Sequence, residues 1–246
     1  MIELARPETG HAFQSELVAE LTAAFADLRT STHRAAVITG SGRVFCTGAH
    51  LQSLAGLAQA SAAARLADAS QLAALYTAIL RCPLPTLAAV NGAAYGGGVG
   101  LAGACDFVVA APTALFQFSE VRLGFVPALI SVFLTRRVVS ARLATLFLDP
   151  APLDAAAAAA VGLVDEVAND PLERAVERGV EIAAKAAPSA IAETKRLLLA
   201  CTLPQLDQQL AHAAQVNAAQ RAHPDCQRGI AEFLAHRTFP TWLEEK

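Results

Sequence analysis

Short apolar runs alternate along the chain with longer amphipathic segments. Mainly apolar runs at 35–39, 87–90 and 107–110 predict buried β-strands. Apolar residues spaced by three and four predict helices at 11–28 and 61–81. Strands and helices in this order, with glycine-rich turns after the first two strands, predict right-handed crossovers and a mostly parallel sheet. The first half of the chain is therefore expected to fold as an α/β unit.

The chain from residue 150 onward is predicted to be mainly helical. Helical spacing recurs at 154–161, 171–187, 189–202, 205–219 and 224–236, and a short apolar link at 163–167 has strand character. The aromatic residues Phe239 and Trp242 follow the last helix and are expected to dock onto a neighbouring helix or subunit. We therefore divide the chain into an α/β core at 1–188 and a C-terminal helical subdomain at 189–246.

Composition and charge narrow the class of protein. The chain has 246 residues, of which 54% are hydrophobic, enough for one substantial core. Its net charge of −3 argues against a nucleic-acid partner. The length of its apolar runs leads us to expect neither a membrane span nor a signal peptide. The five cysteines lack metal-ligand spacing, so we expect reduced thiols in a cytoplasmic protein and no metal site.

The segment 86–111 carries the strongest chemical signal. Gly96, Gly97 and Gly98 lie between a predicted strand and a short apolar helix. Glycines at a helix start let a ligand oxygen approach backbone N–H groups, and the helix dipole adds partial positive charge there. This favours an anion or oxyanion site, while close packing of the helix on the strand is the structural alternative.

A dinucleotide pattern overlaps the same segment. Gly98, Gly100 and Gly103 match G-x-G-x-x-G. These glycines fall inside the predicted helix, however, and no acidic residue follows at the distance expected for a ribose partner. Nucleotide binding is therefore the weaker interpretation, and the absence of a thermal shift with NAD or FAD would exclude it.

Glu120 is the candidate acid or base. It follows an extended piece at 115–118 and is flanked by apolar residues. Burial would raise its pKa and suit it to proton transfer near neutral pH. The alternative is a carboxylate paired with Arg122 or Arg136. A second small-residue turn, Gly48-Ala49, also exposes backbone N–H groups, ahead of a predicted loop at 51–62.

Together these motifs resemble the enoyl-CoA hydratase/isomerase (crotonase) family. The likeness rests on Gly48-Ala49, on Gly96-Gly97-Gly98 and on Glu120, twenty residues after Gly100. It extends over nearly the whole chain, through Val37-Ile38-Thr39-Gly40, Val90-Asn91-Gly92 and Cys105-Asp106 to the tail at 237–242. The resemblance implies an α/β fold with a crotonase-like ββα spiral core and a C-terminal helical subdomain that takes part in trimerisation.

The resemblance also implies roles for individual residues. The backbone N–H groups of Ala49 and Gly97 would form an oxyanion hole for a thioester carbonyl, each worth roughly 3–4 kcal/mol in the transition state. Glu120 would be the acid/base beside Cα and Cβ of the acyl group. The acyl-CoA would bind along a set of loop residues, with unassigned basic residues near its phosphates. That set is Cys46, Gly48, His50, Leu51, Gly96 and Gly98.

Three departures from the family pattern bear on the mechanism. Hydratases with two glutamates carry the first where this chain has Gly100, so this catalytic position lacks a functional group. The position after Ala49, usually aspartate, is His50. The N-terminus is short and is expected to lack the first strand of the family's sheet.

The resemblance favours hydration of a 2-enoyl-CoA by Glu120 alone. The run 118–124 looks most like that of methylglutaconyl-CoA hydratases. Double-bond isomerisation by the same carboxylate is the alternative, and a catalytically silent acyl-CoA-binding protein is a third possibility of a different class. The family further implies homotrimers or hexamers, with coenzyme A entering only as part of the substrate.

Overall fold

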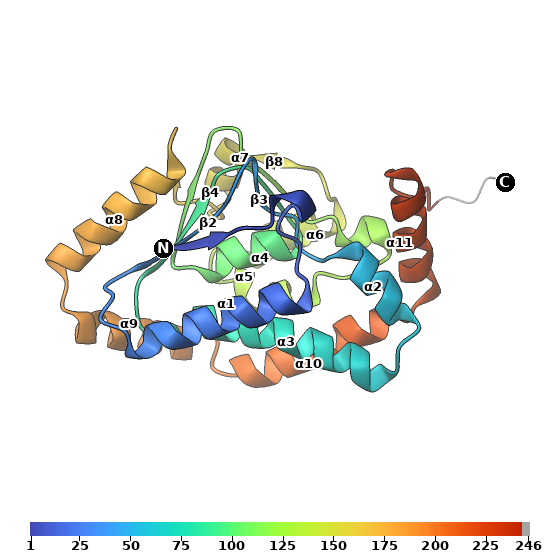
Figure 1. The fold of residues 1–246 in the computed structure, drawn as a ribbon, viewed down its shortest axis with the longest axis horizontal. Coiled ribbons are helices and arrows are strands. Elements are labelled where there is room, and N and C mark those ends of the chain that lie inside the picture. Colours follow the sequence, from blue (N-terminus) through green and yellow to red (C-terminus); the bar gives the residue numbers. More distant parts are fainter. Residues whose placement is uncertain (243–246) are drawn as a thin grey trace.

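Two β-sheets organise the protein, whose computed structural model describes residues 1–242 (Figure 1). The first sheet has the order β1-β2-β4-β6-β9 and all its neighbouring strands are parallel. Its strands are β1 (Ile2–Leu4), β2 (Ala36–Gly40), β4 (Thr86–Val90), β6 (Phe107–Ala110) and β9 (Glu166–Val167). This confirms the expected α/β class with a parallel sheet.

The second sheet is smaller and carries parts of the site. It has the order β3-β5-β7-β8, parallel except for the β7–β8 pair. Its strands are β3 (Val44–Cys46), β5 (Ala93–Tyr95), β7 (Leu115–Gln117) and β8 (Leu153–Asp154). After β2, β4 and β6 the chain continues into β3, β5 and β7, which are neighbours in this second sheet. The turns between these strands therefore lie side by side, although they are far apart in sequence.

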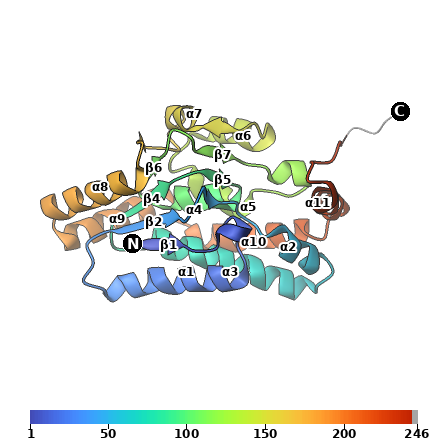
Figure 2. The ribbon, with the colours of Figure 1, turned by 45° about the horizontal axis from the view of Figure 1, so that its top comes forward.

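Helices cover both faces of the first sheet. Alternating side chains of β2, β4 and β6 divide between two cores, since Ile38 and Ala88 face one and Val37 and Leu87 the other. The second core is covered by α8 (Pro171–Lys185), through Ala175. The larger core contains side chains of α1 (Ser15–Asp27), α3 (Ala62–Leu80), α4 (Gly97–Ala104), α5 (Ala128–Leu134) and α10 (Leu206–Gln220). Figure 2 shows α1 and α3 side by side beneath the sheet.

The remaining helices lie around this core. They are α2 (Leu51–Ala58), α6 (Ser140–Leu148), α7 (Ala155–Ala160), α9 (Pro188–Thr202) and α11 (Pro224–His236), with 3₁₀ turns η1 (Pro7–Thr9), η2 (Leu28–Thr30) and η3 (Glu120–Leu123). Helix α11 packs against α2 and η3. No described helix is both long and apolar enough to cross a membrane.

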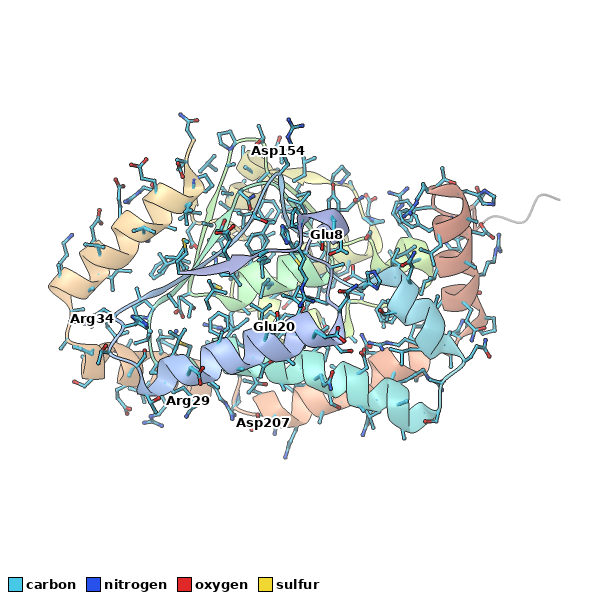
Figure 3. All side chains as sticks on the ribbon, in the orientation of Figure 1. Glu8, Glu20, Arg29, Arg34, Asp154 and Asp207 are labelled. Atoms are coloured by element: carbon cyan, nitrogen blue, oxygen red, sulfur yellow. The ribbon has the colours of Figure 1, made fainter. Side chains whose placement is uncertain are left out.

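Charged side chains at the periphery tie distant segments together (Figure 3). Arg34 donates to the carbonyl oxygens of Ala183 and Ala186 at 2.9 Å, which joins the start of β2 to the end of α8. Asp207 of α10 accepts from Arg81, just after α3, at 2.8 Å. Exposed ion pairs of this kind add only about 0–1 kcal/mol each, so the apolar cores dominate stability.

Several predicted elements need correction. The first helix begins at Ser15 rather than near His11, because Phe13 N–H donates to Gly48 O at 2.7 Å and keeps that segment extended. Residues 51–58 form α2 instead of a loop. The short strand β5 and helix α6 have no counterpart among the predicted elements.

The predicted docking of the aromatic tail is confirmed within the described residues. The Phe239 ring lies 4.9 Å from that of Phe233 on α11, centroid to centroid. The Trp242 indole N–H donates to Arg122 O at 3.2 Å. The tail therefore packs on α11 and on η3, the turn that carries Glu120.

Candidate active site

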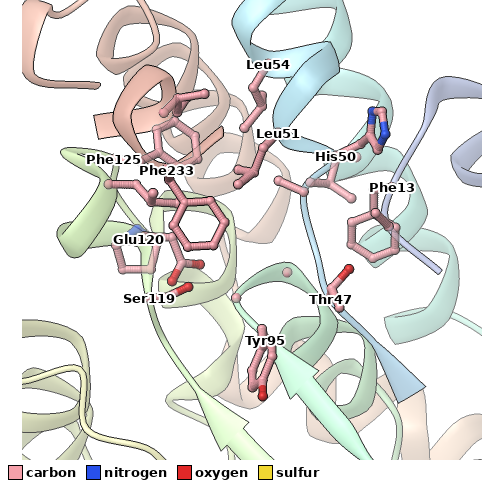
Figure 4. Close-up of a pocket in the computed structure, with 18 of the residues that line it drawn as sticks. Phe13, Thr47, His50, Leu51, Leu54, Tyr95, Ser119, Glu120, Phe125 and Phe233 are labelled. Atoms are coloured by element: carbon pink, nitrogen blue, oxygen red, sulfur yellow. The ribbon is translucent and has the colours of Figure 1, made fainter. Parts of the chain in front are cut away.

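A cavity of about 700 Å³ lies between the start of α4, η3, α2 and α11 (Figure 4). Its volume is in the range of small-molecule sites. Apolar side chains from α2, α11 and the segments next to η3 form much of its wall, namely Leu51, Leu54, Phe125, Ile230, Phe233, Leu234 and Phe239. Polar groups are fewer and include Thr47, Tyr95, Ser119 and Glu120. The cavity therefore suits a largely apolar ligand with one reactive polar end.

The turn before α4 has a conformation that only glycine adopts easily. Gly96 has φ 49° and ψ −116°, and its N–H donates to Gln117 O on the adjacent strand β7 at 2.8 Å. Helix α4 begins at Gly97, so the Gly97 N–H has no partner within its own helix. Gly97 is half-buried and lines the cavity. This N–H is therefore placed for a ligand oxygen.

The turn at Gly48-Ala49 lies in backbone contact with the first turn. Gly48 has φ 76°, and a Cβ atom there would lie 2.8 Å from the Gly97 nitrogen and 2.5 Å from Tyr95 O. A Cβ atom on Gly98 would lie 2.0 Å from Cys46 O. Only glycine allows this approach, which brings Ala49 and Gly97 to one wall of the cavity.

Glu120 is buried, with 9% of its surface exposed, and one of its oxygens lacks a partner. Its Oε2 has no hydrogen bond to any described residue. Burial raises its pKa to about 7, because the charged form loses hydration without gaining an ion pair. The alternative of a pair with Arg122 or Arg136 is wrong, since neither guanidinium forms an ion pair with Glu120 among the described residues. The Arg122 guanidinium stacks instead on the Phe239 ring, 3.6 Å from its centroid. Glu120 is therefore a carboxylate able to bind or release a proton near neutral pH.

His50 and Leu51 lie at the start of α2. His50 is the N-cap residue, and its Nδ1 accepts from the Ser53 N–H at 3.3 Å. Its side chain therefore stabilises the helix that forms part of the cavity wall. Leu51 and Gly96 also line the cavity.

The other predicted site residues lie behind the cavity wall. Cys46, Gly48, Gly98 and Gly100 are buried and do not line the cavity. The Cys46 thiol donates to His11 O at 3.2 Å, and burial raises its pKa to about 12. Cys46, Gly48 and Gly98 lie at the packed contact between the Gly48-Ala49 turn and the Gly96–Gly98 turn.

The three glycines of the dinucleotide pattern serve close packing. All lie within α4, and Cβ atoms on Gly98, Gly100 and Gly103 would approach Cys46 O, Ile130 and Leu134 to within 2.0–2.3 Å. Space for a pyrophosphate is already filled by protein atoms. The nucleotide-binding interpretation is therefore wrong for this pattern.

Several cavity residues were not predicted from the sequence. Tyr76 of α3 and Phe13 reach the cavity, as do aromatic side chains of α11 and the tail. Tyr76 and Phe13 have the helical spacing of ordinary core residues, so no sequence signal separates them from packing positions. Only the fold reveals their place.

Comparisons with known proteins agree with this architecture. The family model for enoyl-CoA hydratase/isomerase matches residues 1–245. A Thermus thermophilus protein named "Putative enoyl-CoA hydratase" is 36% identical over 241 residues, which cover 96% of this chain and 94% of that protein. The chain belongs to the enoyl-CoA hydratase/isomerase family.

Solved structures give the same fold. An enoyl-CoA hydratase/isomerase from Mycobacterium paratuberculosis has a TM-score of 0.86 at 27% identity, covering 94% of this chain and 92% of that one. An enoyl-CoA hydratase from Mycobacterium avium has a TM-score of 0.84 at 29% identity, covering 98% and 93%. The predicted crotonase-like fold is confirmed.

Proposed function

We propose that the protein is an enoyl-CoA hydratase that adds water across the 2,3 double bond of an acyl-CoA thioester. The supporting observation is the buried, unpaired carboxylate of Glu120 in a cavity that Ala49 and Gly97 also line. The N–H groups of Ala49 and Gly97 would hold the thioester oxygen. Family membership and relatives named as enoyl-CoA hydratases favour this reaction class.

In the proposed mechanism one carboxylate moves one proton twice. Glu120 takes a proton from water as the water oxygen bonds to C3. The electrons of the double bond move toward the thioester carbonyl and give an enolate, which the two N–H groups stabilise. Glu120 then returns the proton to C2, so the carboxylate is restored and the net change is addition of water. Coenzyme A takes part only as the thioester group.

Isomerisation of a 3-enoyl-CoA is the second candidate, because Glu120 is the one buried carboxylate among the described residues that line the cavity. A Cβ atom at Gly100 would lie 2.3 Å from Ile130 Cγ2, so no second carboxylate fits there without rearrangement. In this reaction Glu120 would move a proton from C2 to C4. A cinnamoyl-CoA, which lacks a γ-hydrogen, separates the two reactions because only a hydratase can act on it.

The test follows ultraviolet absorbance of the conjugated thioester with crotonyl-CoA and then methylglutaconyl-CoA. We expect absorbance to fall with the wild type, to stay constant with Glu120→Gln, and to fall normally with Glu16→Gln, an exposed carboxylate on α1. Absorbance gained from a 3-enoyl-CoA, with no loss from either 2-enoyl-CoA, would support isomerisation instead. Binding of all these thioesters without turnover would support the silent acyl-CoA-binding alternative.

We also propose a homotrimer or hexamer, with residues 189–246 as the subdomain that takes part in assembly and the cytoplasm as the location. The assembly proposal is supported by exposed apolar side chains on the adjacent helices α8 and α9. Val180 is 64% exposed, and Leu197 and Leu198 are 51% and 56% exposed. Such side chains on neighbouring helices favour burial against another subunit.

A further inference from the structure

Tyr76 places a buried hydroxyl directly behind the turn at Gly96–Gly98. It lies on α3, is fully buried, and donates from Oη to Gly97 O at 3.0 Å. Burial raises the pKa of Tyr76 well above 10, and the nearby Cys46 and Glu120 raise it further. Burial thus favours the protonated hydroxyl, the form that donates to Gly97 O.

The same hydroxyl fills space beside Gly100. A Cβ atom on Gly100 would lie 2.9 Å from Tyr76 Oη, in addition to its contact with Ile130. A Cβ atom on Gly97 would lie 3.2 Å from Tyr76 Oη. One oxygen thus packs against both Gly97 and Gly100. The place where two-glutamate hydratases carry a carboxylate is here occupied by a phenol and a methyl group.

The Tyr76 ring is packed within the larger core. Its centroid lies 4.9 Å from that of Phe133, and α3 packs between α1 and α10. The turn itself is three consecutive glycines, whose backbone is intrinsically the most mobile. An oxyanion hole acts through preorganised donors, so a glycine turn of this kind needs fixed anchors. Two hydrogen bonds tie the turn to neighbouring elements, from the Gly96 N–H to Gln117 O and from the Tyr76 hydroxyl to Gly97 O.

We propose that Tyr76 is a positioning residue that fixes the Gly96–Gly98 turn so that the Gly97 N–H faces the thioester oxygen. This inference rests on the proposed function. Tyr76 acts through the turn and exchanges no proton with the substrate. The Ile130 methyl group and the Tyr76 hydroxyl together leave no room for a side chain at position 100.

The first experiment compares Tyr76→Phe with Thr77→Val. Both substitutions remove one hydroxyl from α3, but the hydrogen bond that Thr77 Oγ1 makes among the described residues is to Ala73 O of its own helix, at 2.9 Å. Tyr76→Phe is expected to lower kcat for crotonyl-CoA about ten- to hundredfold with KM within about twofold, since the loss falls on transition-state stabilisation. Thr77→Val is expected to keep both constants.

The second readout needs no turnover. A cinnamoyl thioester with an electron-donating substituent on its ring resists attack of water at C3, so it stays intact in the site. It absorbs at longer wavelength when donors polarise its carbonyl, so the red shift of the bound thioester reports the geometry of the two N–H groups. We expect Tyr76→Phe to bind this thioester with a clearly smaller red shift than the wild type, and Thr77→Val to match the wild type.

A second pair of variants keeps the inference testable if Tyr76→Phe fails to fold. Gly100→Ala and Gly103→Ala both add a methyl group to α4 that meets a side-chain methyl at 2.3 Å, from Ile130 and Leu134 respectively. Only Gly100→Ala also crowds the Tyr76 hydroxyl. We expect the two variants to lose similar amounts of thermal stability. The red shift of the bound thioester should be smaller with Gly100→Ala and equal to that of the wild type with Gly103→Ala.

The outcomes separate this inference from the proposed function. A wild type that shifts the band of this thioester but hydrates neither crotonyl-CoA nor methylglutaconyl-CoA contradicts the proposed hydratase, while the comparison of red shifts still tests Tyr76. A folded Tyr76→Phe with wild-type kcat and red shift overturns the inference, whatever its thermal stability. A Gly100→Ala red shift equal to that of Gly103→Ala also overturns it.

Discussion

The carboxylate of Glu120 lies against the backbone of Gly96. A Cβ atom at Gly96 would be 3.0 Å from Oε1 and 3.6 Å from Oε2 of this side chain. Gly96 also has φ 49°, a conformation that L-residues rarely adopt. Any side chain at position 96 would therefore strain the turn and push the carboxylate away at the same time.

Gly96→Ala is therefore expected to lower kcat/KM for crotonyl-CoA about a hundredfold, since displacing a reacting group by about 1 Å has an effect of this size. Gly56→Ala is the matched control, because a Cβ atom there meets nothing within 4 Å. Gly56 lies inside α2, so its replacement should preserve activity and stabilise the fold by about 0.5–1 kcal/mol. Near-normal kcat/KM in Gly96→Ala would show that the carboxylate is not held by this contact.

The activity should depend on pH through Glu120. Its pKa of about 7 means that the carboxylate form, which takes the proton from water, predominates above that value and declines below it. The value of kcat/KM is therefore expected to rise with pH and to level off above a midpoint near pH 7. Initial rates from about pH 5 to about pH 9 would measure the midpoint of the free enzyme. A profile that is flat across this interval would contradict the role of Glu120 as the base.

The stability of the protein should change with pH in the opposite direction to its activity, again because of Glu120. Its folded-state pKa is raised, so its contribution to stability is fully present below its unfolded pKa and is lost as the pH rises through about 7. The rise from 4.5 to about 7 corresponds to a penalty of about 3 kcal/mol for the ionised form. Glu120→Gln removes this penalty but buries an amide, so we expect a net gain of about 2 kcal/mol at about pH 8.

Urea unfolding of the wild type and Glu120→Gln at about pH 8 and about pH 5 measures this difference. The gain should shrink at the lower pH, where the wild-type carboxyl is protonated in the folded protein. Glu16→Gln, in the exposed first turn of α1, should lower the free energy of unfolding by no more than about 1 kcal/mol at either pH, the contribution of a carboxylate near a helix N-terminus. A Glu120→Gln variant less stable than the wild type at about pH 8 would show that the carboxylate has solvent or partners when ionised.

Local sequence signals were sufficient for the strongly patterned elements. The apolar run of β6 and the proline-started helix α11 have the bounds that the pattern predicts, Phe107–Ala110 and Pro224–His236. Glu120, flanked by apolar residues, is buried as expected. In each case the decisive information lies within a few neighbouring residues.

The missed features depend on contacts between distant segments. The strand β5 is only Ala93–Tyr95 and exists because it pairs with β3 and β7. The contact between Gly48 and Gly97 joins turns of different strands, so a list of glycines cannot reveal it. Tyr76 has the spacing of a core residue, and its hydroxyl gains a role only through Gly97 O. Neither pattern nor propensity carries this information.

Helix α2 gives the last prediction, because its cap is a histidine. His50 Nδ1 accepts from the Ser53 N–H, and α2 supplies Leu51 and Leu54 to the cavity wall. His50→Ala should destabilise the protein by about 1 kcal/mol, the usual effect of losing an N-cap, and raise KM a few-fold as the wall loosens. His50→Asp should restore both, since a carboxylate caps the same N–H groups and favours the positive end of the helix dipole. Urea unfolding and KM for crotonyl-CoA measure the two effects, and an impaired His50→Asp would instead place the imidazole in contact with the substrate.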